Sequence, residues 1–104
     1  MPLKLPLLLT ALLAPALPAS ADPLAQGRAF VEANCARCHA VGTTDASPNP
    51  RSIPFRFVAR LYPIEYLAEA LAEGIAVSHE MPEFVLEADQ IEPLLLYLDS
   101  IQVR

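Results

Sequence analysis

The stretch Asn34-Cys35-Ala36-Arg37-Cys38-His39-Ala40 holds both cysteines of the chain and one of its two histidines. Cysteines three residues apart, followed at once by a histidine, bring three ligand-type side chains onto one face of a helix or helical turn. Four kinds of site use such an arrangement: a disulfide, a zinc site, a thiol-redox pair, and the attachment point of a larger covalent group. The rest of the sequence decides which of these four sites the chain carries, and the kind of site in turn indicates the fold.

The chain of 104 residues begins with a segment unlike the rest. Lys4 is the only charged residue before Asp22, and a leucine-rich apolar run ends in Ala19-Ser20-Ala21, a small-x-small cleavage pattern. This order predicts a secretory signal peptide over residues 1–21 and one exported domain over residues 22–104. An uncleaved membrane anchor is the alternative. The prolines of the segment disfavour it, because they interrupt a short helix that must satisfy its own backbone in lipid.

The composition of the predicted domain limits its partners. The whole chain has a net charge of −5, and removing Lys4 with the leader makes the remainder more acidic. An acidic domain does not bind nucleic acid by neutralising phosphates. A domain of this length buries only about 60% of its unfolded surface, so we expect a disulfide, a metal or a cofactor to stabilise it. A bridge between Cys35 and Cys38 would close a very small loop and remove little chain entropy.

Helical segments bracket a proline-rich loop, and no strand pattern is evident, so the predicted fold is all-α. The first helix is expected from Pro23 to about Ala40, with Asp22 as its N-cap. Gly27 lies inside it and should cost about 1 kcal/mol relative to alanine, which indicates close packing against another element. The proline-rich stretch 41–55 is expected to form a loop.

Two further helices are predicted after that loop. One begins at Pro63 and ends at Gly74, with apolar residues repeating at three and four positions. The last carries a helical stripe of Ile91, Leu94, Leu95, Leu98 and Ile101. Pro93 allows two starts for it, near Glu92 with the proline in the first turn, or near Ala88 with a bend. The earlier start is preferred.

Three of the four sites fit this context poorly. A thiol-redox pair needs a low-pKa thiolate, usually at a helix N-terminus after a strand, whereas this motif ends a predicted helix. Zinc needs four ligands, and beyond the cysteines only His39 and His79 remain, with His39 awkwardly adjacent to Cys38. A disulfide between cysteines this close is strained and stabilises little.

The fourth site is covalent haem, for which Cys-x-x-Cys-His is the attachment signature. Each thiol adds across one vinyl group to make a thioether, and the histidine lies under the iron as its proximal ligand. The sequence therefore predicts one haem c, held covalently by Cys35 and Cys38, with His39 on the iron. An exported domain whose only cysteines form this motif strengthens the prediction.

The other face of the iron has three candidate occupants: water, His79 and Met81. Met81 is the only methionine after the leader and lies in a polar loop, although a lone methionine can also be a core gap-filler. Loops lie at the surface unless something holds them, and Pro82 favours an extended conformation at Met81. Imidazole would lower the reduction potential, whereas a thioether favours ferrous iron and raises it. Met81 is the preferred ligand, with His79 in reserve.

Together these motifs resemble those of the class I cytochrome c family, in particular its small soluble bacterial single-haem members. The resemblance covers nearly all of the predicted domain and rests on Gly27 eight residues before Cys35, on Cys35–His39, on Met81-Pro82-Glu83-Phe84, and on Tyr97 in the last helix. It implies N- and C-terminal helices that cross at Gly27, with Tyr97 packed there, in a helical fold wrapped around one haem. Four residues before the first cysteine, where the family often has an aromatic residue, this chain has Val31, and Phe30 is the candidate substitute.

The family also uses a proline carbonyl to accept a hydrogen bond from the second nitrogen of the proximal histidine, which orients the ring. The candidates here are Pro48, Pro50 and Pro54. Expected pocket liners are Phe55, Phe57, Tyr62, Phe84 and several leucines, and Arg51 or Arg56 is a candidate partner for a haem propionate.

The resemblance implies a periplasmic one-electron carrier and not an enzyme. We expect transient contacts with redox protein partners, no membrane span after leader cleavage, and a monomer. One alternative is a dedicated cytochrome subunit of a periplasmic dehydrogenase or oxidase, which an exposed apolar patch would favour. Another is a ligand-binding or peroxidatic haem protein, which needs a labile sixth site.

Overall fold

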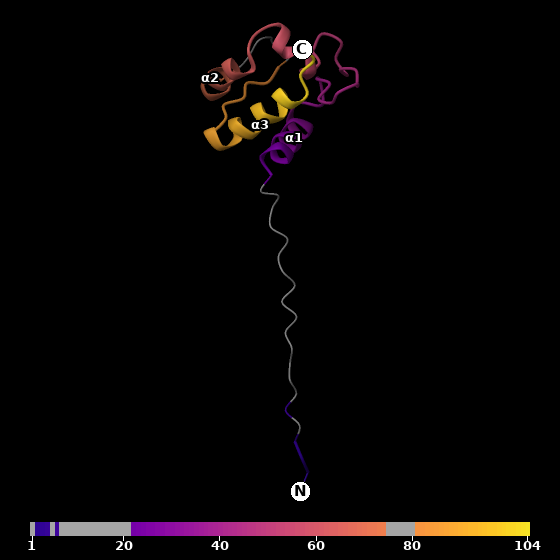
Figure 1. Ribbon diagram of the computed structural model, residues 1–104, viewed down its shortest axis with the longest axis vertical. Coiled ribbons are helices and arrows are strands. Elements are labelled where there is room, and N and C mark those ends of the chain that lie inside the picture. Colours follow the sequence, from indigo (N-terminus) through magenta and orange to yellow (C-terminus); the bar gives the residue numbers. More distant parts are fainter. Residues whose placement is uncertain (1, 5, 7–21, 75–80) are drawn as a thin grey trace.

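The computed structural model describes residues 2–4, 6, 22–74 and 81–104 (Figure 1). Its elements, in chain order, are the α-helix α1 (Pro23–Asn34), the 3-10 helices η1 (Phe55–Arg60) and η2 (Ile64–Tyr66), and the α-helices α2 (Leu67–Glu73) and α3 (Ala88–Ser100). The described residues contain no strand, which confirms the all-α prediction. The predicted signal peptide falls largely outside the described residues and stays a prediction.

The start of α1 is as predicted, and its end is not. Pro23 occupies the first turn, and the carboxylate of the N-cap Asp22 accepts a hydrogen bond of 3.1 Å from the Leu24 amide. The helix stops at Asn34 and does not run on to Ala40. After Asn34 the amides of Cys35 and Ala36 both donate to the Val31 carbonyl, at 2.8 Å and 3.1 Å, so the α-helical spacing of four is lost at Ala36. The cysteine–histidine motif therefore lies in the turn after the helix.

The crossing of α1 and α3 is centred on Gly27. The two helices pack against each other more extensively than any other pair of described elements. A Cβ atom on Gly27 would lie 2.0 Å from the Pro93 carbonyl oxygen and 2.9 Å from Tyr97 Cβ. Any larger side chain would force the helices apart, because real Cβ atoms do not approach so closely. The expectation that Gly27 packs closely, with Tyr97 against it, is confirmed.

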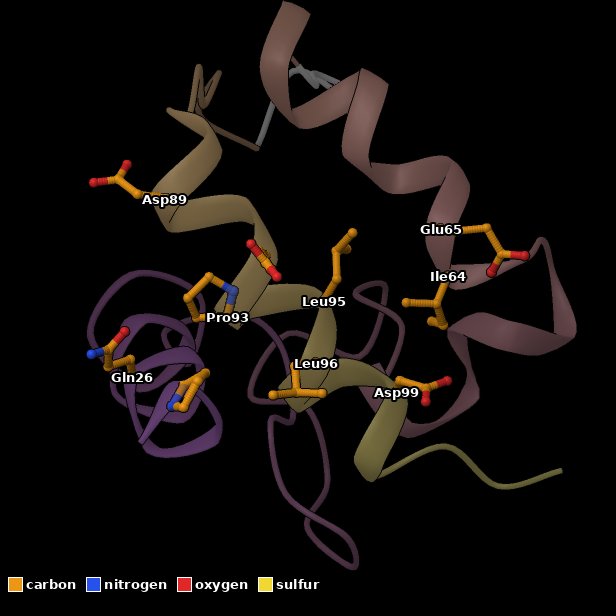
Figure 2. A pocket seen from close by; sticks show the side chains of 10 residues that line it. Gln26, Ile64, Glu65, Asp89, Pro93, Leu95, Leu96 and Asp99 are labelled. Carbon is orange, nitrogen blue, oxygen red and sulfur yellow. The ribbon is translucent and has the colours of Figure 1, made fainter. Parts of the chain in front are cut away.

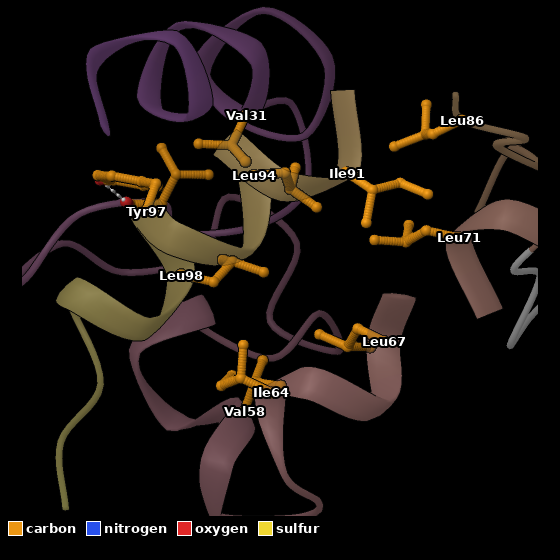
Figure 3. Close-up of a cluster of buried hydrophobic side chains, with 11 residues drawn as sticks. Val31, Val58, Ile64, Leu67, Leu71, Leu86, Ile91, Leu94, Tyr97 and Leu98 are labelled. Atoms are coloured by element: carbon orange, nitrogen blue, oxygen red, sulfur yellow. Dashed lines mark hydrogen bonds between the residues drawn. The ribbon is translucent and has the colours of Figure 1, made fainter. Parts of the chain in front are cut away.

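Helix α3 begins at Ala88, the earlier of the two predicted starts, and keeps Pro93 in its interior. A capping box holds the first turn: the Glu87 side chain accepts from the backbone at Gln90, and the Glu87 amide donates to Gln90 Oε1 at 3.1 Å. The buried stripe of α3 faces the remaining elements, as Figure 3 shows. The core consists of Val31, Val41, Val58, Ile64, Leu67, Leu71, Leu86, Ile91, Leu94, Tyr97 and Leu98.

The second predicted helix is split into two parts. Pro63 precedes the short η2, and the regular α-helix α2 begins only at Leu67. It ends where predicted, at Gly74, whose φ of +111° is a conformation that glycine adopts without strain. The Leu86 amide donates to the Leu71 carbonyl at 2.8 Å, so the chain after Met81 lies along α2. Within the described ranges, no helix is long and apolar enough to cross a bilayer.

Candidate functional site

The cysteine–histidine motif forms a single tight turn. The amides of Cys38 and His39 both donate to the Cys35 carbonyl, at 3.2 Å and 3.0 Å. The Cys35 amide in turn donates to the Val31 carbonyl at 2.8 Å, which joins the turn to the end of α1. Both cysteines are half-buried and carry free thiols, so they are not joined in a disulfide.

The imidazole of His39 is held on two sides. Its Nδ1 lies 2.8 Å from the Ile53 carbonyl oxygen, and its ring lies 4.5 Å from the Phe55 ring at an interplanar angle of 31°. Because a carbonyl only accepts, Nδ1 carries the proton in this bond, and Nε2 keeps its lone pair for a metal or a donor. Such a bond fixes the tautomer and the orientation of a ligating histidine.

The acceptor of this bond differs from the predicted one. None of the three candidate prolines supplies the carbonyl; Ile53, the residue before Pro54, supplies it. A residue before proline is confined to extended conformations, and the Pro54 backbone is itself extended, with φ −60° and ψ 131°. The Phe55 amide donates to the Ala40 carbonyl at 2.9 Å and draws this extended segment alongside the motif. Pro54 therefore supports the bond to His39 indirectly, by keeping the preceding residue, Ile53, in an extended conformation.

Cys35, His39 and Met81 line one cavity, although Met81 is more than forty positions further along the chain. The other lining residues are Phe30, Ile53, Phe55, Val58, Tyr62, Leu67, Leu71, Phe84, Leu86, Leu94 and Leu98. The volume of the cavity is about 110 Å³, and the hollow around it, including space open to solvent, is about 700 Å³. Cys38 is half-buried and is not among the residues that line the cavity, and His79 lies outside the described residues.

Most of the predicted aromatic liners reach the cavity. Phe55, Tyr62 and Phe84 line it, and so does Phe30, the candidate substitute for the aromatic residue absent at Val31. Phe57 does not. In a 3-10 helix residues three apart eclipse each other, so Phe55 and Val58 share the cavity side and Phe57 shares the other side with Arg60.

The ring of Phe57 lies between two guanidinium groups. Those of Arg56 and Arg60 stand 4.7 Å and 4.5 Å from its centre. Arg56 also donates to the Asp45 carbonyl at 2.6 Å, and its guanidinium lies 3.8 Å from the Asp45 carboxylate. Its charge is therefore engaged within the chain, and the propionate role stays a prediction.

The electrostatics of Cys35 oppose a thiol-redox role. Burial raises the pKa of the Cys35 thiol to about 11, because the thiolate would lose its solvation. Reactive thiols have a lowered pKa, usually at a helix N-terminus or beside a cation. Cys35 instead follows the carbonyl end of α1, where the helix dipole disfavours a negative charge. The arrangement therefore keeps this sulfur protonated at neutral pH.

The donor set fits a covalently attached haem better than zinc. No three histidine, cysteine or acidic side chains gather within residues 22–74 and 81–104 in a way that would hold a metal ion. The zinc site would also need His79, which lies outside those ranges. A thiol, an imidazole with one committed nitrogen, and a thioether around an apolar cavity match the ligands of a c-type haem. Ligand pockets usually measure about 300–1,000 Å³, so the lining side chains must move apart to admit so large a group.

Gln102 contributes a contact that sequence reasoning missed. Its Nε2 donates to the carbonyls of Phe55 and Leu98, at 2.6 Å and 2.8 Å, and its Oε1 accepts from the Ala59 amide at 2.8 Å. It thereby clamps η1, which carries Phe55, to the end of α3. No sequence signal marks this role, because a glutamine near a helix end is ordinary and two of its three partners, Phe55 and Ala59, lie more than forty positions away.

Comparison with models of known protein families, with curated proteins and with solved structures gives no match. The resemblance to class I cytochromes c therefore rests on this chain's own residues.

Proposed function

We propose that the protein is a monohaem c-type cytochrome that carries one electron at a time. Cys35 and Cys38 hold the haem through thioethers, and His39 and Met81 are the axial ligands of the iron. The observation that carries the proposal is the meeting of Cys35, His39 and Met81 at one apolar cavity. The motif and the methionine loop are far apart in sequence, and their meeting at one cavity is what His39 and Met81 as ligands of one iron require.

Each residue has a distinct role in this function. When bound, the haem supplies an iron that cycles between ferrous and ferric states. The Ile53 carbonyl orients His39 and raises its basicity through the 2.8 Å bond to Nδ1. The Met81 thioether favours the ferrous state and raises the reduction potential. The apolar lining excludes water, which limits the change in solvation when the charge changes.

The proposed fold is that of a class I cytochrome c wrapped around its haem. Its support is the crossing of the first and last helices at Gly27, with Tyr97 packed at the crossing. The predicted signal peptide places the protein in the periplasm, where haem attachment to reduced thiols takes place. There it acts as a monomer that meets its redox partners transiently.

The intact mass of the exported protein tests the proposal. The protein is expressed with a haem-attachment system, then denatured and reduced before mass spectrometry. We expect the mass of residues 22–104 plus one haem, an adduct that survives denaturation. The Cys35→Ser, Cys38→Ser double variant is the control and should show the polypeptide mass alone. A bare polypeptide mass for the unaltered chain would refute the proposal and return zinc and thiol redox to consideration.

Replacement of Met81 distinguishes the electron carrier from a haem protein with a labile sixth site. In Met81→Ala we expect the long-wavelength absorption of thioether-ligated ferric haem to disappear and the reduction potential to fall. His79→Ala should leave both unchanged. An unchanged spectrum in Met81→Ala would favour the ligand-binding alternative. If the spectrum and the potential changed only in His79→Ala, His79 would be the second ligand of the iron.

A further inference from the structure

A second hollow lies on the opposite side of α3 from the haem cavity. It is an open groove of about 640 Å³ that crosses α3 between the start of α1 and η2 (Figure 2). Its lining consists of Pro23, Gln26, Ile64, Glu65, Asp89, Glu92, Pro93, Leu95, Leu96 and Asp99. None of these residues lines the haem cavity, to which α3 contributes Leu94 and Leu98. We call this hollow the α3 groove.

The α3 groove has an apolar floor. Leu96 remains 47% exposed although it lies in the middle of a well-formed helix. Leu95 and Ile64 extend the apolar surface beside it, and the rings of Pro23 and Pro93 continue it toward α1. An apolar centre surrounded by polar groups is the usual anatomy of a protein interaction site.

The rim of the groove carries one sign of charge. Four carboxylates belong to its lining, those of Glu65, Asp89, Glu92 and Asp99, and among the residues that the structure describes no cationic side chain lines it. Asp99 pairs with Arg104 at one end. Asp89, Glu92 and Leu96 recur at three- and four-residue steps along the outer face of α3, opposite its buried stripe. A ligand that complements this row of acidic groups around a leucine carries positive charges on both sides of an apolar side chain.

We propose that the α3 groove docks a basic amphipathic segment of a partner protein. An aliphatic or aromatic side chain of that segment packs against Leu96 and Leu95, and arginine or lysine side chains on either side pair with the carboxylates. This is the helix-in-groove mode of recognition with charge complementarity at the rim. A second copy of this chain is a poor occupant, because its net charge is −5.

The position of the groove defines what such docking achieves. Because α3 separates the groove from the haem cavity, a partner bound there leaves the mouth of the cavity free. The groove would then hold the cytochrome to a partner while electrons enter and leave elsewhere, as in a dedicated subunit. This consequence rests on the proposed function, whereas the binding itself does not.

The test uses the full-length exported protein and a synthetic helical peptide with leucines on one face and arginines on both flanks of it. Binding is followed by fluorescence anisotropy and mapped by amide chemical shifts. We expect the largest shifts at Leu95, Leu96 and Glu92, and binding that weakens with added salt, because exposed charge pairs are screened. A peptide with glutamates in place of the arginines should not bind.

Two matched pairs of variants distinguish binding in the α3 groove from non-specific attraction to an acidic protein. The triple variant Glu65→Gln, Asp89→Asn, Glu92→Gln should bind the peptide about tenfold more weakly, since each exposed pair contributes about 0.5 kcal/mol. The variant Glu69→Gln, Glu73→Gln, Glu83→Gln changes the net charge equally outside the groove and should bind nearly as well as the unaltered protein. Leu96→Asp should abolish binding, while Val85→Asp, also at an exposed apolar residue, should not.

Each other outcome overturns the proposal. Equal losses in the two triple variants would mean non-specific attraction. Shifts centred on Tyr62 and Met81 would place the binding at the cavity mouth. Self-association that Leu96→Asp removes, without peptide binding, would make the occupant a second copy. The absorption spectrum of the same sample reports haem separately, so groove binding without haem would sink only the proposed function, and haem without groove binding only this inference.

Discussion

At the scale of single residues, the phenol of Tyr97 ties α3 to the loop after the cysteine–histidine motif. The residue is 7% exposed and donates a hydrogen bond of 2.5 Å to the Val41 carbonyl. We expect Tyr97→Phe to lower the free energy of unfolding at neutral pH by about 1–3 kcal/mol, because the buried carbonyl loses its donor. Urea denaturation measures this loss. Tyr66→Phe is the control, since Tyr66 is 68% exposed and should change stability little.

The same phenol makes the stability depend on pH. Burial raises the pKa of Tyr97 above its usual value, because the phenolate would lose its solvation. The unfolded chain therefore releases this proton first, near its ordinary pKa of about 10. The stabilisation is complete below that pH and is lost as the pH rises through the folded pKa. Above about pH 10 the unaltered protein should lose stability more steeply than Tyr97→Phe, and parallel curves would contradict this assignment.

At the scale of elements, Gly27 sets the distance between α1 and α3. A Cβ at this position would lie 2.0 Å from the Pro93 carbonyl oxygen, so Gly27→Ala must push the helices apart. We expect a loss of about 1–3 kcal/mol in the free energy of unfolding, although alanine alone favours a helix by about 1 kcal/mol. Ala29→Val, on the exposed side of α1, adds more volume and should cost less. A stabilised Gly27→Ala variant would show that the crossing is looser than described.

Gln102 acts at the same scale by clamping η1 to α3. Gln102→Ala leaves the Phe55 carbonyl and the Ala59 amide without this partner, and we expect it to cost about 2–3 kcal/mol in urea denaturation. The control Gln90→Ala, which removes an exposed capping contact, should cost only about 1 kcal/mol. Equal losses in the two variants would refute a special role for Gln102. The reduction potential of haem-loaded Gln102→Ala should also shift, because the ring of Phe55 lies against His39.

Elements whose sequence signal is local were predictable. The apolar stripe of α3, its start at Ala88 and the glycine stop of α2 follow from spacing and capping within a few residues. The crossing at Gly27 followed because a mid-helix glycine is costly and needs a reason. The meeting of Cys35, His39 and Met81 at one cavity was predictable from chemistry alone, because all three carry side chains of the ligand type.

The features that could not be predicted depend on contacts between residues far apart in the sequence or on local geometry that no residue pattern marks. Helix α1 ends early, with the Ala36 amide donating to the Val31 carbonyl five positions back, and no pattern in the sequence marks this change. The carbonyl that holds His39 belongs to Ile53, fourteen positions away, and loop packing selects it. Phe57 turns away from the cavity because residues three apart share a side of a 3-10 helix, which places Phe57 with Arg60.

At the scale of the whole molecule, the core and the cavity around Cys35, His39 and Met81 share side chains. The residues that belong to both are Val58, Leu67, Leu71, Leu86, Leu94 and Leu98. A domain of this size has little apolar surface to spare, so the side chains around the cavity contribute most when an apolar group packs against them. A covalently bound haem there would bury further apolar surface, at about 25 cal/mol per Å².

Stability should therefore track haem attachment. We expect the haem-loaded protein to exceed the Cys35→Ser, Cys38→Ser variant by about 3 kcal/mol or more in the free energy of unfolding, measured by urea denaturation, since burying roughly 120 Å² of further apolar surface contributes about 3 kcal/mol. The unaltered chain expressed without a haem-attachment system is the matched control. It should unfold with the double variant, because neither fills the cavity and a serine at each position is a small change. If the loaded protein unfolds with these two, the cavity is not where the haem lies, and the core closes by some other means.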